Sequence, residues 1–204
     1  MLFIFDMGNV ITGNVDVLPR ISEKLLIPQA EISDFCGPDF LQLTTGKITT
    51  GMFWKQFSDH FQVRIQENYL YTCFKPENDL VMINLINEIR SSGHSVVCGT
   101  NTLDDHYRYH LSRGDYSVFD YVYASHMMGC AKPDPEFYLH ILRCEKYRPE
   151  ETVFIDDMDI NVKSAEDIGI HSFLFEGYDK LIRDMKDEGL EDLRGIPVIE
   201  GRGL

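Results

Sequence analysis

The sequence is poor in basic residues and has no long hydrophobic run. Its 204 residues include 19 Lys and Arg against 33 Asp and Glu, which gives a formal net charge of -14 at pH 7. Nucleic acids and anionic membrane surfaces are bound through clustered Lys and Arg, so we expect neither as a partner. No segment approaches the roughly 20 consecutive apolar residues of a transmembrane helix, so we also expect no membrane span.

Cysteine occurs without any pairing pattern. The chain has five cysteines, an odd number, and no two of them form a C-x-x-C motif. Scattered cysteines are typical of reduced thiols in the cytosol, so we predict a cytoplasmic protein. The apolar start, "MLFIFDMGNV", is too short for a signal peptide and contains an acidic residue.

The hydrophobic residues are numerous enough for a core and follow two patterns. They make up 44% of the chain, which suits one domain, or one domain with a small insert. A short apolar run, "LFIF", predicts a first buried strand. From about residue 14 to residue 71 the apolar residues have helical spacing, as in "ITTGMFWKQFSDHF", and predict helices only.

After residue 77 the sequence alternates between helical and strand patterns. Short apolar runs, "SVVCG", "YVYAS", "TVFI" and "HSFLF", are separated by segments with helical spacing. This alternation predicts a parallel sheet covered by helices on both faces. We therefore predict a doubly wound α/β core formed by residues 1–13 and 77–204, with a helical cap inserted as residues 14–76.

Polar residues with chemical potential follow four of the predicted strands. In an open α/β sheet, ligands bind at the carboxyl ends of the strands, so we expect these side chains to converge at one edge. They are Asp6 after the first strand, Thr100 and Asn101 after the second, Lys132 after the third, and Asp156 and Asp157 after the fourth.

This combination predicts phosphoryl transfer. A carboxylate such as Asp6 attacks phosphorus and forms an aspartyl-phosphate, which divides one difficult step into two. Asp6 and Asp157 are hard oxygen ligands that suit Mg²⁺, which would screen the carboxylate from the phosphate dianion. Thr100 and Lys132 would hold the phosphate oxygens and stabilise the transition state. Further donors are expected from the backbone N–H groups of Met7, Gly8 and Asn101.

The motifs, in this order, resemble those of the haloacid dehalogenase superfamily. Asp6 in "FDMGNV" corresponds to the nucleophile motif, Thr100 in "VVCGTNT" to the second motif, and Lys132 in "AKPDPEFY" to the third. The fourth motif is "FIDDMDINVKSAEDIGI". The insert resembles the helical C1 cap of that superfamily. "FDMGNV" and "GKITTGMFW" are most similar to its sugar-phosphate (glucose-1-phosphate) phosphatase branch.

The resemblance implies a Rossmann-like core, Mg²⁺ as cofactor and a small phosphorylated metabolite as substrate. The implied metal ligands are Asp6, the backbone carbonyl of Gly8 and Asp157. Asp156 would bind the metal through water or hold Lys132. In the cap, the aromatic residues of "MFWKQFSDHF" fit a hydrophobic core, and Trp54 is our candidate among them for a substrate contact.

Gly8 departs from the pattern of the superfamily. Phosphatases of this kind commonly have a second Asp two residues after the nucleophile, which acts as a general acid and base. Gly8 keeps the carbonyl but cannot donate a proton, and such a group contributes about 10²–10⁴-fold to the rate. We therefore expect a slow phosphatase or a proton supplied from elsewhere, with poor leaving groups affected most.

Two other functions remain open at this stage. A 2-haloacid dehalogenase also uses an Asp nucleophile, but it needs no metal, and the tandem acids of "FIDDM" favour a metal. A regulatory protein that binds a phosphorylated ligand and turns it over weakly is supported only by Gly8. A phosphomutase is disfavoured, because its cycle needs the second Asp.

The remaining candidates have simpler interpretations. His106 and His110 have the i,i+4 spacing of half a zinc site, but without a third ligand nearby we expect solvated helix positions. Cys98 lies in a predicted strand and is expected to be buried and inert. The sequence leaves the oligomeric state open between a monomer and a homodimer.

Overall fold

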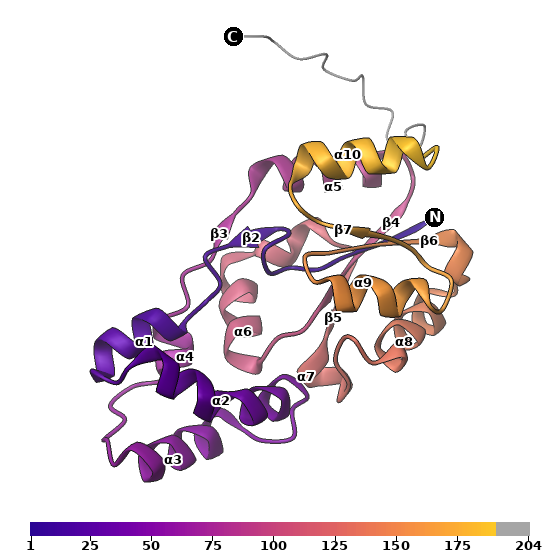
Figure 1. The fold of residues 1–204 in the computed structure, drawn as a ribbon. Coiled ribbons are helices and arrows are strands. Elements are labelled where there is room, and N and C mark those ends of the chain that lie inside the picture. Colours follow the sequence, from indigo (N-terminus) through magenta and orange to yellow (C-terminus); the bar gives the residue numbers. More distant parts are fainter. Residues whose placement is uncertain (191–204) are drawn as a thin grey trace, which may run out of the picture.

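The computed structural model describes residues 1–190. The end of the predicted core range, residues 191–204, therefore lies outside the described residues. The core is a five-stranded parallel sheet with the strand order β5-β4-β1-β6-β7, so β1 is central and lies between β4 and β6 (Figure 1). The strands are β1 (Leu2–Phe5), β4 (Ser95–Thr100), β5 (Tyr121–Ala124), β6 (Thr152–Asp156) and β7 (His171–Leu174).

Helices cover both faces of the sheet, which confirms the predicted doubly wound α/β fold. In β1, Phe3 and Phe5 point to the face covered by α5 and α10, whereas Leu2 and Ile4 point to the face covered by α8 and α9. Alternate side chains of a strand point to opposite faces, and all four are fully buried, which explains the continuous apolar run. The core helices are α5 (Leu80–Ser91), α6 (Asp104–Arg113), α7 (Ser125–Met128), α8 (Pro135–Glu145), α9 (Asp159–Glu166) and α10 (Tyr178–Asp187), with 3₁₀ turns at Asp115–Val118 and Pro149–Glu151.

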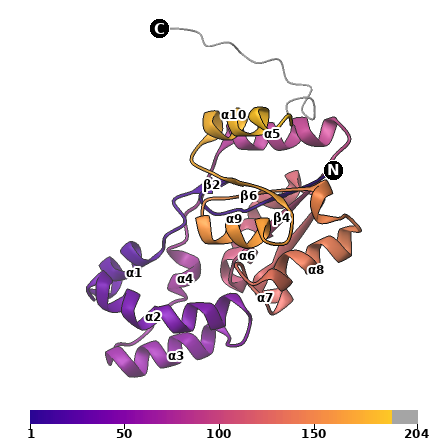
Figure 2. The same ribbon diagram turned by 45° about the vertical axis from the view of Figure 1, so that its right-hand side comes forward.

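Four helices form a separate cap beside the carboxyl ends of the strands (Figure 2). Two short strands, β2 (Thr12–Gly13) and β3 (Glu77–Asn78), pair in antiparallel fashion where the chain leaves and re-enters the core. The cap has its own hydrophobic cluster, and Leu103 of the core joins that cluster just before α6. The cap helices are α1 (Leu18–Leu25), α2 (Gln29–Thr44), α3 (Thr50–Phe61) and α4 (Tyr69–Thr72).

Local sequence signals fix where several helices begin. The carboxylate of Asp79 accepts hydrogen bonds from the backbone N–H groups of Val81 and Met82 at the start of α5. Asp134 caps α8 in the same way, and a proline occupies the first turn of that helix. Such caps satisfy N–H groups that have no partner within the helix. They therefore fix the residues at which α5 and α8 begin.

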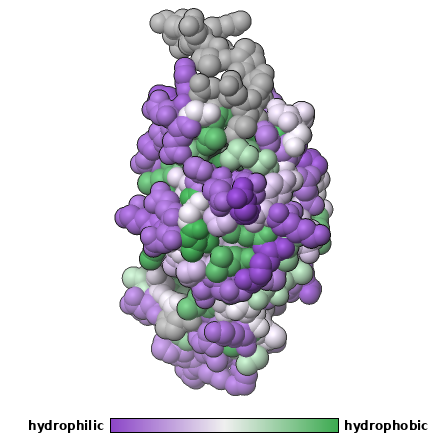
Figure 3. Space-filling model, turned by 90° about the vertical axis from the view of Figure 1, so that its right-hand side faces the viewer, coloured by the Kyte–Doolittle hydropathy of each residue, from purple (hydrophilic) through white to green (hydrophobic). Residues whose placement is uncertain are grey.

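The side of the molecule in Figure 3 carries many hydrophilic residues, and hydrophobic residues gather between them in the middle of that side. Among the described residues, no helix is both long enough and apolar enough to cross a membrane.

Candidate active site

Asp6 lies at the centre of the carboxyl edge of the sheet. It directly follows β1, and its backbone N–H still donates to the carbonyl of Ile155 in β6 (2.9 Å). Because β4 and β6 flank β1, Thr100 at the end of β4 and Asp156 at the end of β6 lie on either side of Asp6. Burial raises the pKa of Asp6 to about 6, an effect that Lys132 opposes and Asp156 reinforces.

Lys132 is buried between two carboxylates. Its Nζ lies 2.8 Å from Oδ1 of Asp6 and 2.6 Å from Oδ2 of Asp156, and its side chain is 1% exposed. Burial by itself lowers the pKa of Lys132, but the two carboxylates outweigh burial and the net pKa is raised, so the ammonium group stays charged. Lys132 is therefore a buried, paired cation and not a solvated charge of the loop.

Asn101 fixes the backbone of Lys132. Its side-chain amide donates to the carbonyl of Lys132 (2.8 Å) and accepts from the backbone N–H of the same residue (2.8 Å). The side chain of Asn101 is thus engaged within the protein. Only its backbone N–H group remains available for the predicted phosphate cradle.

Asp156 is a positioning residue for three neighbours. Besides Lys132, it accepts hydrogen bonds from the backbone N–H of Met158 (2.8 Å) and from the side chain of Asn161 (2.9 Å), both on Oδ1. Asp156 is fully buried. Its oxygens therefore hold Lys132 and the start of α9. The sequence left two roles open for Asp156, and the structure shows the second, the contact with Lys132.

Three carboxylates come close enough to share one cation. Oxygen atoms of Asp6, Asp156 and Asp157 all lie within 4.8 Å of one another. Asp157 is half-buried, and its Oδ2 accepts a hydrogen bond from the side chain of Asn9 (2.9 Å). An all-oxygen donor set of this kind fits Mg²⁺, which binds proteins through one or two carboxylates and keeps other positions for water and phosphate.

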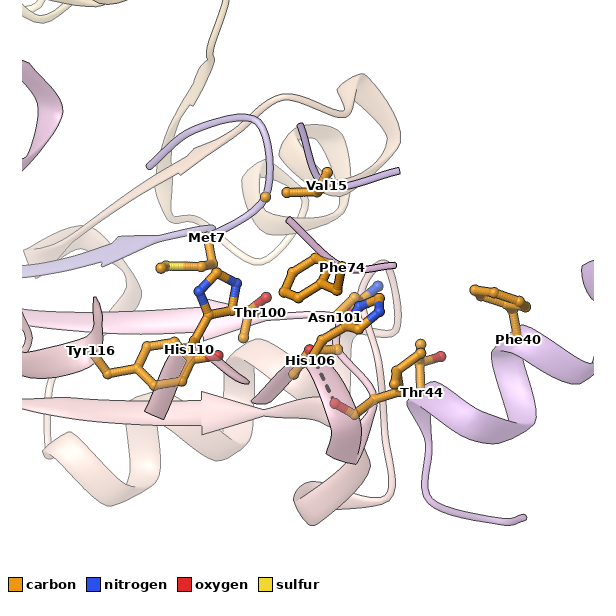
Figure 4. Close-up of a pocket in the computed structure, with 13 residues that line it drawn as sticks. Met7, Val15, Phe40, Thr44, Phe74, Thr100, Asn101, His106, His110 and Tyr116 are labelled. Atoms are coloured by element: carbon orange, nitrogen blue, oxygen red, sulfur yellow. Dashed lines mark hydrogen bonds between the residues drawn. The ribbon is translucent and has the colours of Figure 1, made fainter. Parts of the chain in front are cut away.

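A cavity of about 200 Å³ adjoins this cluster between the core and the cap (Figure 4). Met7, Gly8, Thr100 and Asn101 line it on the side of the strand ends. Thr100 is buried there and does not cap α6, which begins at Asp104. Since Met7 and Gly8 directly follow Asp6, the cavity lies next to the predicted nucleophile.

Gly8 has no conformational or steric reason to be glycine. Its φ lies outside the positive range, and a Cβ at this position would meet only Val15, at 3.8 Å. A side chain is therefore compatible with the backbone here. The absence of one removes a proton donor and leaves space beside the predicted nucleophile.

His106 and His110 both line the cavity, so the prediction that they are solvated helix positions is wrong. His110 is 3% exposed and its Nδ1 lies 2.8 Å from a carboxylate oxygen of Asp115. His106 stacks on the ring of Phe74 at a centroid distance of 3.8 Å and hydrogen-bonds the carbonyl of Leu70 (3.0 Å). Their i,i+4 spacing placed both on one face of α6, but only the position of the cap shows that this face is covered.

Trp54 lies in the core of the cap and is not among the residues that line the cavity. Its indole N–H donates to Asn68 (2.9 Å), and its ring packs against Phe53, Phe57 and Tyr69. Residues of the cap range that do line the cavity are Phe40 and Thr44 of α2, together with Val15 and Phe74 near the two ends of the insert. The sequence gave no signal that could distinguish these residues from the other apolar and polar positions of the cap.

The sequence profile of a family described as haloacid dehalogenase-like hydrolase matches residues 3–175. The chain belongs to this family. The predicted membership of the haloacid dehalogenase superfamily is thereby confirmed, and the protein is a hydrolase of that family.

Curated relatives of this haloacid dehalogenase-like hydrolase differ widely in length. Sesquiterpene phosphatase astK of Aspergillus oryzae is 31% identical over 176 residues, which cover 82% of this chain and 85% of the relative. Acyl-CoA dehydrogenase family member 10 of Mus musculus is 27% identical over 215 residues, which cover 96% of this chain but 19% of the relative. The chain therefore spans most of the first protein and less than a fifth of the second.

A solved structure with the same fold comes from Bacteroides thetaiotaomicron. It is a variant of a haloacid dehalogenase family enzyme in complex with magnesium and inorganic phosphate. The TM-score is 0.76 at 24% identity, and the match covers 89% of this chain and 98% of the other. At this identity the likeness establishes the fold.

Proposed function

We propose that the protein is a Mg²⁺-dependent phosphatase that hydrolyses a small phosphomonoester through an aspartyl-phosphate on Asp6. The observation that carries this proposal is the convergence of Asp6, Lys132 and Asp157 at the carboxyl edge of the sheet, beside a cavity. A nucleophilic carboxylate, a fixed cation and an oxygen-rich metal site are what phosphoryl transfer requires.

Each residue has a separate role in the proposed reaction. Asp6 attacks phosphorus, the ester bond breaks, and the leaving alcohol takes its proton from water, because Gly8 offers none. Water then attacks phosphorus and releases inorganic phosphate and free Asp6. Lys132 stays charged throughout and stabilises the negative charge on the phosphoryl oxygens. Thr100 donates a hydrogen bond from its hydroxyl group to one of these oxygens.

The metal would be held by Asp6, Asp157 and the backbone carbonyl of Gly8, with Asp156 next to them. Bound there, Mg²⁺ would neutralise charge on the phosphate and let the carboxylate approach it. The neighbouring structure from Bacteroides thetaiotaomicron, which contains magnesium and inorganic phosphate, supports this assignment. The phosphatase from Aspergillus oryzae supports a phosphomonoester as the substrate.

The alternatives are less well supported. A metal-independent dehalogenase does not need three carboxylates within 4.8 Å of one another. A purely regulatory protein needs no buried nucleophile paired with a lysine, and only Gly8 favours it. The small volume of the cavity, about 200 Å³, favours a metabolite over a macromolecule as the substrate.

Hydrolysis of 4-nitrophenyl phosphate tests the proposal directly. We expect turnover with Mg²⁺, none with EDTA, and none for Asp6→Asn in the presence of Mg²⁺. Circular dichroism of the variant shows whether the fold is kept. Turnover that survives in EDTA, or in folded Asp6→Asn, would rule out the proposed mechanism.

A further inference from the structure

The cavity beside Asp6 is lined by uncharged residue types. Thirteen of the described residues line it, and none of the thirteen is Asp, Glu, Lys or Arg. Its volume of about 200 Å³ is below the range of roughly 300–1,000 Å³ typical of drug-sized ligands, so its occupant is small.

The two histidines do not supply a cation to this cavity. His110 is held by Asp115, which also accepts from Asn78 (2.9 Å) and lies 3.2 Å from Arg113. Burial lowers the pKa of His110, although Asp115 opposes the change, and burial lowers the pKa of His106 as well. Both imidazoles are therefore neutral near pH 7.

The walls combine apolar faces with neutral polar groups. The stacked rings of Phe74 and His106 form one wall, and Phe40 lies across the cavity on the cap (Figure 4). The hydroxyl of Tyr116 is buried and has no hydrogen-bond partner among the described residues. A ligand with hydroxyl groups and a carbon face fits such a surface.

A charged leaving group would have no partner here. Moving a carboxylate or phosphate out of water is strongly unfavourable unless an opposite charge or several hydrogen bonds compensate. Lys132, the cation next to Asp6, is already bound to Asp6 and Asp156, and Arg113 lies against Asp115. A second anionic group on the substrate would thus be desolvated without compensation.

We propose that the substrate is the monophosphate of a small uncharged alcohol, and that this cavity rejects phosphomonoesters whose alcohol carries a second charged group. This inference rests on the proposed phosphatase function. It names a class of substrate within that function and assigns the discrimination to the neutral lining between α6 and the cap.

Glycerol 3-phosphate and 3-phosphoglycerate are matched probes, because they differ only in a terminal CH₂OH or carboxylate. At 0.15 M salt with saturating Mg²⁺, we expect kcat/KM to be at least tenfold higher for glycerol 3-phosphate. Similar values for both probes would overturn the inference and leave the phosphatase function intact. No hydrolysis of either probe or of 4-nitrophenyl phosphate would overturn the proposed function, and the inference with it.

A substitution at Thr44 tests whether the cavity is responsible. Thr44 is half-buried at the end of α2 and lines the cavity from the cap. We expect Thr44→Lys to reduce the preference for glycerol 3-phosphate at least fivefold, because it adds the missing cation. Thr44→Met, of similar length but neutral, should keep the preference. Equal preferences in the two variants would show that the leaving group does not lie in this cavity.

Discussion

The side chain of Asn101 and the backbone of Lys132 hold each other through two hydrogen bonds, each 2.8 Å long. This pair joins the end of β4 to the loop after α7 and so fixes the base of the lysine that contacts Asp6. Asn101 lies largely at the surface, so its contribution is to position Lys132 and not to pack the core.

We expect Asn101→Ala to lower kcat/KM for 4-nitrophenyl phosphate about tenfold or more, since a misplacement of catalytic groups by about 1 Å can cost 10²-fold. The inhibition constant of inorganic phosphate should rise in parallel, because we propose that the same lysine binds the phosphate oxygens. Asn87→Ala, an exposed asparagine on α5, is the matched control. Unchanged kinetics in Asn101→Ala would show that Lys132 is held by other contacts.

Removal of the lysine charge should destabilise the fold. Lys132→Met leaves Asp6 and Asp156 buried next to each other without a cation, and breaking a buried ion pair costs about 3–5 kcal/mol. Urea denaturation without Mg²⁺ measures this loss. The double variant with Asp156→Asn should recover part of the stability, because it removes one of the two like charges. If the double variant is no more stable than Lys132→Met, charge repulsion is not the cause.

Gly8→Asp should increase activity toward esters with poor leaving groups. The position has room for a side chain, and a carboxyl group there would supply a proton to the departing alcohol. We expect a gain of about 10-fold or more for an alkyl phosphate and a much smaller gain for 4-nitrophenyl phosphate. Gly8→Asn is the control of the same shape. A gain shared by both variants would point to a change in packing instead of proton transfer.

The stability of the protein should depend on pH through His106. Its ordinary pKa of 6.5 applies in the unfolded chain, and burial lowers the pKa to about 3 in the folded state. Between these values the unfolded state binds a proton that the folded state does not. The contribution of His106 is thus complete above pH 6.5 and is lost as the pH falls toward 3, at most about 1.4 kcal/mol per pH unit.

His106→Phe isolates this effect because the phenyl ring preserves stacking on Phe74. The free energy of unfolding is measured in urea at pH 7.5 and at pH 5 for both proteins. Its decrease from pH 7.5 to pH 5 should be about 1–2 kcal/mol smaller in the variant than in the wild type. The lost hydrogen bond to Leu70 lowers stability at both pH values alike. Identical pH dependence in the two proteins would contradict the burial of a neutral imidazole.

Asn9 should contribute to metal affinity. It reaches from the loop after β1 to Asp157 and donates a 2.9 Å hydrogen bond to one of its oxygens. Loss of such an outer contact typically lowers metal affinity 10–100-fold. Because this bond is exposed, we expect Asn9→Ala to lower the Mg²⁺ affinity by about 10-fold, the lower end of that range. The affinity is measured as the Mg²⁺ concentration that gives half of the maximal rise in melting temperature. Asp157→Asn should abolish that rise, and equal Mg²⁺ responses in Asn9→Ala and wild type would contradict the role of Asn9.

Much of the fold and of the charged cluster was predictable from the sequence. The continuous apolar run at β1 and the alternation after residue 77 indicated a buried parallel sheet, because strands in such a sheet are covered on both faces. The carboxyl ends of parallel strands meet at one edge, so Asp6, Thr100 and the tandem acids were expected together. The cap helices were expected as well, although no pattern indicated which of their faces meets the core.

The sequence by itself determined the elements and the residues at the ends of the strands, since strand and helix patterns depend on near neighbours along the chain. Only the tertiary structure decided that Asp156 holds Lys132, that Asn101 binds its backbone and that His106 and His110 lie beneath the cap. It also placed Trp54 in the cap core and Thr44 at the cavity. These outcomes depend on how the cap packs against α6, which joins residues far apart in sequence, and spacing along the chain carries no information about that contact.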